Sequence, residues 1–244
     1  IKETQMDAIL FFRLGDFYEM FLDDAIVASK ALDLTLTGRG KDENRIPMCG
    51  IPYHAADSYI PRLVKQGHKV AVCEQVEEAS EAKGITRREV VRVITPGTLS
   101  GDGHVDDHDH NFLVAVSKGP KDSGYGLAYV DVSTGDFSVA VFPQKEGLMG
   151  YVQRLGANEV VIPESLAEEF AFGEGVLVNQ STFLDEERSA DELKRHFELQ
   201  DLAAFGLKEH GVAMPAAWGL IRYVLGISQS KVPHITKMVP VALS

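Results

Sequence analysis

Residues 10–21 read LFFRLGDFYEMF, and this stretch decides how the N-terminal part of the chain folds. The apolar run Ile9–Phe12 is typical of a buried strand, and Gly15-Asp16 ends it with a turn signal. From Phe17 to Leu32 apolar residues recur at helical spacing, and Asp16 suits the N-cap position. We therefore predict a strand over Ile9–Arg13, followed by a helix that starts at Phe17.

The spacing of the apolar residues allows two interpretations of Phe17 and Glu19. In the first, which spacing alone favours, Phe17 and Phe21 share the buried face of a helix while Glu19 is solvated. In the second, Phe17 is displayed at the turn as a wedge. Apolar side chains that enter base steps from the minor groove unstack them and kink the duplex, at about a few kcal/mol per step. That cost is smallest where pairing is already defective, so a wedge selects deformable sites.

Charge is unevenly distributed along the chain. The net charge of −12 over 244 residues argues at first against a polyanion as partner. Residues 1–98, however, carry 13 Lys and Arg against 15 Asp and Glu, whereas residues 99–244 carry 11 against 21. A surface that binds nucleic acid is therefore expected in the first part, where the available cations are Arg39, Lys41, Arg45, Lys65, Lys69, Arg87, Arg88 and Arg92.

The composition is that of a soluble globular protein, with 45% hydrophobic and 25% charged residues. No apolar run approaches the roughly 18 residues of a membrane span, and no signal-peptide pattern opens the chain. The chain starts at Ile1 rather than Met, which we interpret as the mark of a fragment. The two cysteines, Cys49 and Cys73, are too few for a disulfide framework and fit a reducing, cytoplasmic setting.

The order of elements predicts two α/β domains. Alternating short strands and helices over residues 1–98 are typical of a small mixed-sheet α/β domain. Residues 99–111 are polar and without periodicity, so we predict a linker there. Residues 112–244 are predicted to form an RNase H-like α/β domain, because α/β alternation, with helices over 189–206 and 214–228, follows three antiparallel strands at Phe112–Ser117, Gly126–Ser133 and Asp136–Phe142.

Two short segments resemble ligand-binding sites, one for a metal and one for a nucleotide, but neither meets the requirements of such a site. The linker holds the densest set of metal-capable side chains, yet a metal site needs fixed geometry that such a segment rarely supplies, so we prefer a solvated loop for His104, Asp106, Asp107, His108, Asp109 and His110. Gly38-Arg39-Gly40-Lys41 lacks the first Gly and the hydroxyl of a nucleotide-binding phosphate loop. We interpret it as a hairpin tip whose cations can meet a DNA backbone.

Asp131 raises an alternative function, a metal-dependent nuclease that uses the RNase H-like half. That chemistry requires further carboxylates gathered around paired metal ions. Asp136 and Glu159 are the candidates, but they fall at a turn and at a strand start with no recognisable spacing. We therefore prefer a turn-stabilising role for Asp131.

Longer motifs resemble the opening of the MutS family of bacterial DNA mismatch recognition proteins. They are the runs FFRLGDFYEMF (11–21), IPMCGIPYH (46–54), VAVCEQ (70–75), RVITPGT (92–98) and DVSTGDF (131–137). The resemblance covers essentially the whole chain in order, which makes it specific. It implies a mismatch-recognition domain over residues 1–98 and a connector domain over residues 112–244, joined by the linker 99–111.

The resemblance also implies roles for four residues. The family's Phe-x-Glu motif falls on Phe17 and Glu19. By that likeness Phe17 would stack on a mispaired or unpaired base from the minor groove, and Glu19 would hydrogen-bond that base. Met48 and Arg39 would be supporting DNA contacts. This likeness favours the wedge interpretation of Phe17 over the buried one.

In the family, lever, clamp and ATPase domains follow these two domains, and the protein works as a dimer. The resemblance therefore implies that this chain is not itself an enzyme and holds no cofactor or metal, since ATP and Mg belong to the ATPase domain. The expected partners are mismatched double-stranded DNA, a MutL-like protein at the connector domain and, in the full-length protein, a second copy. No membrane partner is expected, and the implied location is cytoplasmic, at the nucleoid when active.

Overall fold

The computed structural model describes residues 1–40, 45–76, 86–99, 110–121, 123–228 and 234–243. Most of the predicted linker, with His104 and Asp106–Asp109 of its metal-capable set, lies outside the described residues, and so does Lys41. The chain divides into two compact units. The first comprises residues 1–96 with 227–229, and the second comprises residues 97–226 with 230–244.

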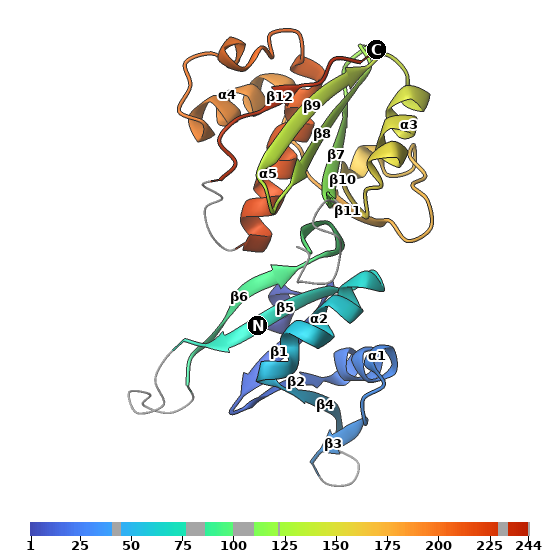
Figure 1. The fold of residues 1–244 in the computed structure, drawn as a ribbon, viewed down its shortest axis with the longest axis vertical. Coiled ribbons are helices and arrows are strands. Elements are labelled where there is room, and N and C mark those ends of the chain that lie inside the picture. The colour runs from blue at the N-terminus through green and yellow to red at the C-terminus, as the bar shows by residue number, and fades with distance from the viewer. Residues whose placement is uncertain (41–44, 77–85, 100–109, 122, 229–233, 244) are drawn as a thin grey trace. The chain divides into compact units, whose positions relative to one another are not determined.

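The first unit is built on a six-stranded mixed sheet with the order β3-β4-β2-β1-β5-β6 (Figure 1). Only the β1–β5 pair is parallel among these described strands. Strand β2 is central, because β1 and β4 both pair with it in antiparallel register. The strands are β1 (Ala8–Leu14), β2 (Phe17–Phe21), β3 (Thr37–Arg39), β4 (Ile46–Pro52), β5 (Lys69–Gln75) and β6 (Arg88–Ile94).

Helices α1 (Leu22–Leu32) and α2 (Ala56–Lys65) lie side by side on this sheet (Figure 1). The Gln66 side-chain amide, just after α2, donates to the Ala31 carbonyl of α1 at 3.1 Å. The Cys49 thiol of β4 lies 3.5 Å from the Ala25 carbonyl, which identifies the sheet face that α1 covers. That face carries the buried side chains Ile9, Phe11, Tyr18, Met20, Cys49, Ile51, Val70 and Val72.

The predicted helix start at Phe17 is wrong. Residues Phe17–Phe21 form strand β2, and α1 begins only at Leu22, with Phe21 as an N-cap that makes no side-chain hydrogen bond. The apolar residues of this segment fit a period of two as well as a helical period. The neighbouring strands decide between the two, because a chain reversal at Gly15, whose φ of 58° suits glycine, places β2 between two hydrogen-bonding partners.

The second unit contains another six-stranded mixed sheet, with the order β11-β10-β7-β8-β9-β12. Its first three strands are antiparallel, as predicted, while β10 pairs in parallel with β7 and β11 in parallel with β10. The mixed α/β class predicted for both domains is therefore confirmed. The strands are β7 (Phe112–Lys118), β8 (Tyr125–Asp131), β9 (Asp136–Phe142), β10 (Glu159–Pro163), β11 (Leu177–Ser181) and β12 (Val239–Pro240).

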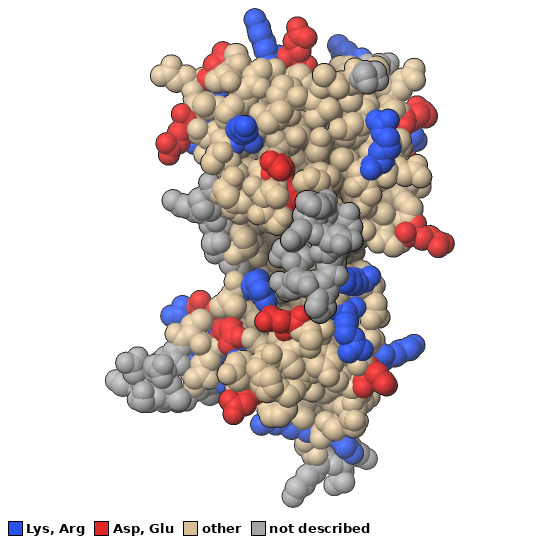
Figure 2. Space-filling view, in the orientation of Figure 1, with Lys and Arg blue, Asp and Glu red and all other residues tan. Residues whose placement is uncertain are grey.

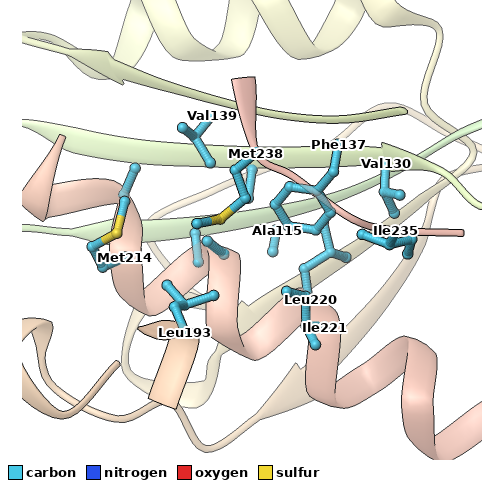
Figure 3. Close-up of a cluster of buried hydrophobic side chains, with 14 of the residues drawn as sticks. Ala115, Val130, Phe137, Val139, Leu193, Met214, Leu220, Ile221, Ile235 and Met238 are labelled. Atoms are coloured by element: carbon cyan, nitrogen blue, oxygen red, sulfur yellow. The ribbon is translucent and has the colours of Figure 1, made fainter. Parts of the chain in front are cut away.

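Helices cover both faces of the second sheet (Figure 1). α3 (Lys145–Leu155) packs on one face through Leu148 and Val152. α4 (Glu186–His196) and α5 (Met214–Ser228) pack on the other, where Leu193, Leu220 and Ile221 meet side chains of the central strands (Figure 3). The helix predicted over 189–206 is thus shorter and starts earlier, and a 3-10 turn (Leu202–Phe205) follows it. The helix predicted over 214–228 is confirmed.

The stretch Gly211–Ser228 corrects one expectation. It forms an 18-residue helical segment that is long and apolar enough to cross a membrane by length and composition, and half of it is buried. Its buried residues, among them Ala217, Leu220 and Val224, belong to the core cluster against the sheet. Packing in this core accounts for its apolar composition.

Candidate nucleic-acid interface

The four predicted site residues share one face of the first sheet, opposite α1 and α2. Side chains alternate along a strand, so Phe17 and Glu19 of β2 point away from the buried Tyr18 and Met20. In the register, Phe21 lies opposite Met48, and Arg39 lies opposite Ile46, the residue two before Met48. We call this surface the outer face and define it by Phe17, Glu19, Phe21, Arg39 and Met48.

Phe17 is the exposed aromatic residue of this face. It pairs with Leu14 on β1 and with Pro52 on β4, at the end of β2 that follows the turn. Its exposed fraction is 47%, so the interpretation in which Phe17 is a core residue is wrong. A large apolar side chain is therefore displayed to solvent from a strand that is hydrogen-bonded on both edges.

The turn before Phe17 is fastened by two residues. The Tyr53 backbone N–H donates to the Asp16 carbonyl at 2.9 Å, and Arg13 Nε donates to the Gly15 carbonyl at 2.5 Å. The Arg13 guanidinium carbon also lies 3.7 Å from the centroid of the Tyr53 ring, within the range of a cation–π contact. These contacts restrict the backbone that presents Phe17.

Strand β2 is also fastened from its buried side. The Tyr18 hydroxyl donates a hydrogen bond to Glu74 of β5, and Arg13 Nη1 lies 3.9 Å from the same carboxylate. Burial, followed by the hydrogen bond and the negative charge of Glu74, raises the pKa of Tyr18 to about 12. The hydroxyl therefore remains a donor at neutral pH and links β2 across β1 to β5.

Glu19 places a carboxylate on the outer face. Its side chain is 22% exposed, and its Oε2 atom is buried without a hydrogen-bond partner among the described residues. Arg39 Nη1 lies 3.9 Å from that oxygen, at ion-pair rather than hydrogen-bond distance. Opposite Glu19 stands Gly50, where a Cβ atom would lie 3.2 Å from the Tyr18 carbonyl oxygen and 3.5 Å from Glu19 Cγ. Glycine therefore keeps space beside the carboxylate.

Met48 and Arg39 complete the outer face in different ways. Met48 is half-buried opposite Phe21, whose ring meets Phe12 edge to face at 6.5 Å between centroids. The Arg39 side chain is 67% exposed and places a cation at the edge of the sheet. Together with Phe17 and Glu19, the face can stack on a planar group, accept or donate a hydrogen bond beside it, and contact an anion.

The cations predicted for a nucleic-acid surface are only partly available. Figure 2 shows acidic and basic side chains interspersed on the visible face of the molecule. Lys69 is buried and pairs with Asp7 at 2.5 Å, while Arg88 is half-buried and donates to the Arg13 carbonyl at 2.9 Å. The exposed members of the described set are Arg39, Arg45, Lys65, Arg87 and Arg92.

Sequence reasoning missed the supporting cluster Arg13, Tyr53 and Glu74. Each residue lies within a motif run that carried the family resemblance, and this was the available signal. Spacing could not reveal that Arg13 contacts the other two, because the three come from β1, from the residue after β4 and from β5.

The carboxylates proposed for a nuclease are used in separate structural roles. Asp131 accepts hydrogen bonds from the Ser133 N–H and hydroxyl and lies 3.1 Å from His110 Nδ1. Burial raises its pKa, but these hydrogen bonds outweigh burial and hold the pKa below its usual value. Glu159 accepts from the Gly97 N–H, Asn179 and Tyr223, and Asp136 accepts from Thr134.

The nuclease alternative is therefore not supported. Within the part of the chain that the structure describes, no three His, Cys, Asp or Glu residues gather as a metal-binding set. Asp131 has the turn-stabilising contacts that we preferred for it, since its partner Ser133 lies in the turn that joins β8 to β9.

Comparison with known proteins agrees with the resemblance drawn from the motifs. The family model described as MutS domain I matches residues 1–103, and that of MutS domain II matches residues 111–236. Proteins named DNA mismatch repair protein MutS are 40% identical in Desulfatibacillum aliphaticivorans, over 98% of this chain, and 44% identical in Pelotomaculum thermopropionicum, over 97%. The alignments cover 28% of each relative, so the chain spans little more than a quarter of their length. The chain therefore belongs to the MutS family and carries its domains I and II in that order.

Proposed function

We propose that this chain recognises mispaired or unpaired bases in double-stranded DNA, as part of a mismatch repair protein. Phe17 is the wedge that stacks on the defective base from the minor groove, and Glu19 hydrogen-bonds that base. The first unit supplies the recognition surface, and the second is the connector. Support for a role in repair comes from family membership and from the names of the relatives.

One observation carries the roles of Phe17 and Glu19. An exposed phenylalanine and an acceptor with no hydrogen-bond partner among the described residues lie two residues apart on the same face of a central strand. That separation is about 7 Å, so a base stacked on the ring can reach the carboxylate with its edge. An aromatic ring exposed on a tightly held backbone is well placed to stack on a base. The same exposed ring adds little to the stability of the DNA-free protein.

The discrimination follows from DNA mechanics. Insertion of Phe17 unstacks a base step, and the energy required is lower at a mismatch or an unpaired base than in a matched duplex. Glu19 adds a hydrogen bond that a correctly paired base, whose edge is occupied, offers less readily. A neutral Glu19 can donate to a purine ring nitrogen, whereas an ionised carboxylate only accepts.

Met48 and Arg39 are proposed as supporting contacts. Arg39 is exposed at the sheet edge, where a phosphate can approach, and Met48 adds an adaptable apolar surface beside Phe21. Phosphate contacts position a protein on the duplex without reading its sequence. Arg39 therefore contributes mainly to affinity and orientation.

The remaining roles are proposed from the family resemblance. The chain itself is not an enzyme and holds no cofactor, and ATP and Mg are bound by an ATPase domain of the longer protein. The connector contacts a MutL-like partner, and the longer protein forms a homodimer in the cytoplasm. The acidic balance of residues 99–244 supports a protein rather than a DNA partner for the connector.

Fluorescence anisotropy tests the function directly. The complete gene product that contains these 244 residues is titrated with labelled duplexes that carry a G·T pair, a single unpaired T or no defect. We expect tighter binding to both defective duplexes than to the matched one. Equal affinity for all three duplexes, at more than one salt concentration, would contradict the proposal.

A further inference from the structure

We propose that Arg39 is a positioning residue that pairs with Glu19 in the free protein and moves to a DNA phosphate when a defective base takes its place. The inference rests on the proposed function of Glu19. It adds a coupling between two contacts: the phosphate contact of Arg39 forms only after the base has engaged Glu19. Arg39 thereby contributes to specificity as well as to affinity.

In the DNA-free protein, Arg39 lies beside the Glu19 carboxylate. Arg39 Nη1 lies 3.9 Å from Glu19 Oε2, and this oxygen is buried without a hydrogen bond from the described residues. The two residues belong to different strands, β3 and β2, with β4 between them. The arginine side chain thus extends across a strand to reach the carboxylate. It neutralises the charge there but leaves the hydrogen-bonding capacity of the oxygen unused.

The contact between Arg39 and Glu19 is weak enough to be exchanged for a phosphate contact. Arg39 is 67% exposed, and its Nη1 lies beyond hydrogen-bond distance of Glu19 Oε2, so the contact itself holds the guanidinium weakly. Departure of the guanidinium removes the cation beside the buried Oε2, which is costly unless a hydrogen-bond donor takes its place there, so Arg39 leaves only when a base engages Glu19. A phosphate accepts two parallel N–H groups from arginine, which is a stronger contact than the one it leaves. A base edge that hydrogen-bonds Glu19 satisfies the oxygen in turn.

The surroundings of Glu19 allow a base to compete with Arg39. Gly50 stands opposite Glu19 and has no side chain to occupy the space beside the carboxylate. Phe17 lies on the same face two residues away, so a base stacked on its ring approaches Glu19 from the exposed side. On a matched duplex no base enters, and Arg39 stays with Glu19.

Salt dependence measures the exchange, because each phosphate contact contributes about 0.9 to the slope of log K against log salt. For the wild-type gene product, the slope on a G·T duplex is expected to exceed that on a matched duplex by about 0.9. The preference for the G·T duplex then falls about 3.5-fold between about 50 and about 200 mM salt. Arg39→Gln should give equal slopes on both duplexes, and Arg39→Lys should restore most of the difference.

Two further variants separate the exchange from a general loss of charge. Glu19→Gln removes the competing anion, so Arg39 is free on both duplexes and the matched slope rises to the G·T slope. Arg45→Gln is the matched control, because Arg45 is an exposed arginine that directly precedes β4 and its side chain lies over Gly38 of β3. It should lower both slopes equally or leave both unchanged, so the difference between them persists.

The outcomes separate this inference from the proposed function. If Phe17→Ala abolishes the G·T preference while wild type and Arg39→Gln show the same slope difference, the exchange is wrong and the wedge stands. If Phe17→Ala leaves the preference unchanged, the proposed function itself fails. The nitrogen-15 NMR signal of Arg39 Nε in the DNA-free gene product gives a check that does not depend on DNA binding. It should shift in Glu19→Gln, and an unchanged signal would contradict the free-state pair.

Discussion

The guanidinium carbon of Arg13 lies 3.7 Å from the centroid of the Tyr53 ring, and the same two residues donate hydrogen bonds to the carbonyls of Gly15 and Asp16. The contact joins the end of β1 to the residue that follows β4. Strand β2 runs between those two strands, so the turn that presents Phe17 is fixed at the point where its neighbours end.

Loss of the Tyr53 ring should loosen this turn. Tyr53→Ala is expected to cost about 1 kcal/mol of unfolding free energy, because the cation–π contact with Arg13 is lost while the backbone hydrogen bond can persist. Tyr53→Phe keeps the ring and should behave as wild type. Urea unfolding gives the free energies, and hydrogen exchange of the amides around Gly15 reports the loosening. Equal exchange rates in both variants would contradict the role of the ring.

Phe17→Ala should separate recognition from folding. The exposed side chain contributes little to stability, so the unfolding free energy should change by less than about 0.5 kcal/mol. The preference for a G·T duplex over a matched one should fall several-fold, as measured by fluorescence anisotropy. Ile26→Ala is a matched control, because Ile26 is also 47% exposed but lies on α1, which covers the other face of the sheet. A similar loss of preference in both variants would argue against a wedge.

Glu19→Gln should keep affinity for the G·T duplex, because the amide retains one acceptor and adds a donor at the same place. Glu19→Ala leaves no side-chain group that can accept or donate a hydrogen bond, so it should weaken binding to the G·T duplex more than binding to the matched duplex. Competition titrations at a single salt concentration measure the two ratios. If the alanine variant discriminated as well as wild type, Glu19 would have no part in reading the base.

Asp131 gives the second unit a pH-dependent contribution to stability. Hydrogen bonds from Ser133 and His110 hold its pKa below 3.8 despite burial. A carboxyl with a depressed folded-state pKa stabilises the fold above its unfolded-state pKa and loses that contribution as the pH falls through the folded-state value. Asp131→Asn should therefore destabilise the protein by about 1–3 kcal/mol at pH 7 and flatten the decline of stability below about pH 4. Thermal unfolding across that range measures both effects.

Glu159 should be intolerant of an isosteric amide. Its Oε1 accepts from Asn179 at 2.7 Å and from Tyr223 at 2.5 Å, and its Oε2 accepts from the Gly97 N–H at 2.8 Å. A glutamine NH₂ in place of either oxygen faces a donor, so Glu159→Gln should cost about 1–3 kcal/mol. Glu168→Gln, at an exposed position, is the control and should change stability by less than about 0.5 kcal/mol. Urea denaturation distinguishes them.

Local patterns predicted the strands of the second unit well. Strands β7, β8 and β9 are apolar runs, and their predicted bounds are confirmed to within two residues. Helix α5 carries a continuous apolar face, which made it recognisable. Phe17–Phe21 failed because its pattern satisfies two periods, and only pairing with β1 and β4 selects the strand.

In the candidate site, too, the sequence predicted single residues but not the contacts between strands. Phe17 and Glu19 came from a motif resemblance, since spacing favoured a buried Phe17. The Arg13–Tyr53 contact and the Arg39–Glu19 pair join segments that are distant in sequence, so they depend on the sheet order. Strand order is a property of the assembled sheet, and no local window contains it.

The central position of β2 has a mechanical consequence. A loop that pushed a ring against stacked bases would bend under the reaction force. A load on Phe17 is instead carried in shear by the hydrogen bonds to β1 and β4, and from β1 it passes to β5. For the wedge that we propose, the sheet is then expected to be the stiffer body, so the deformation would fall on the duplex and its local stiffness would decide how far the ring enters.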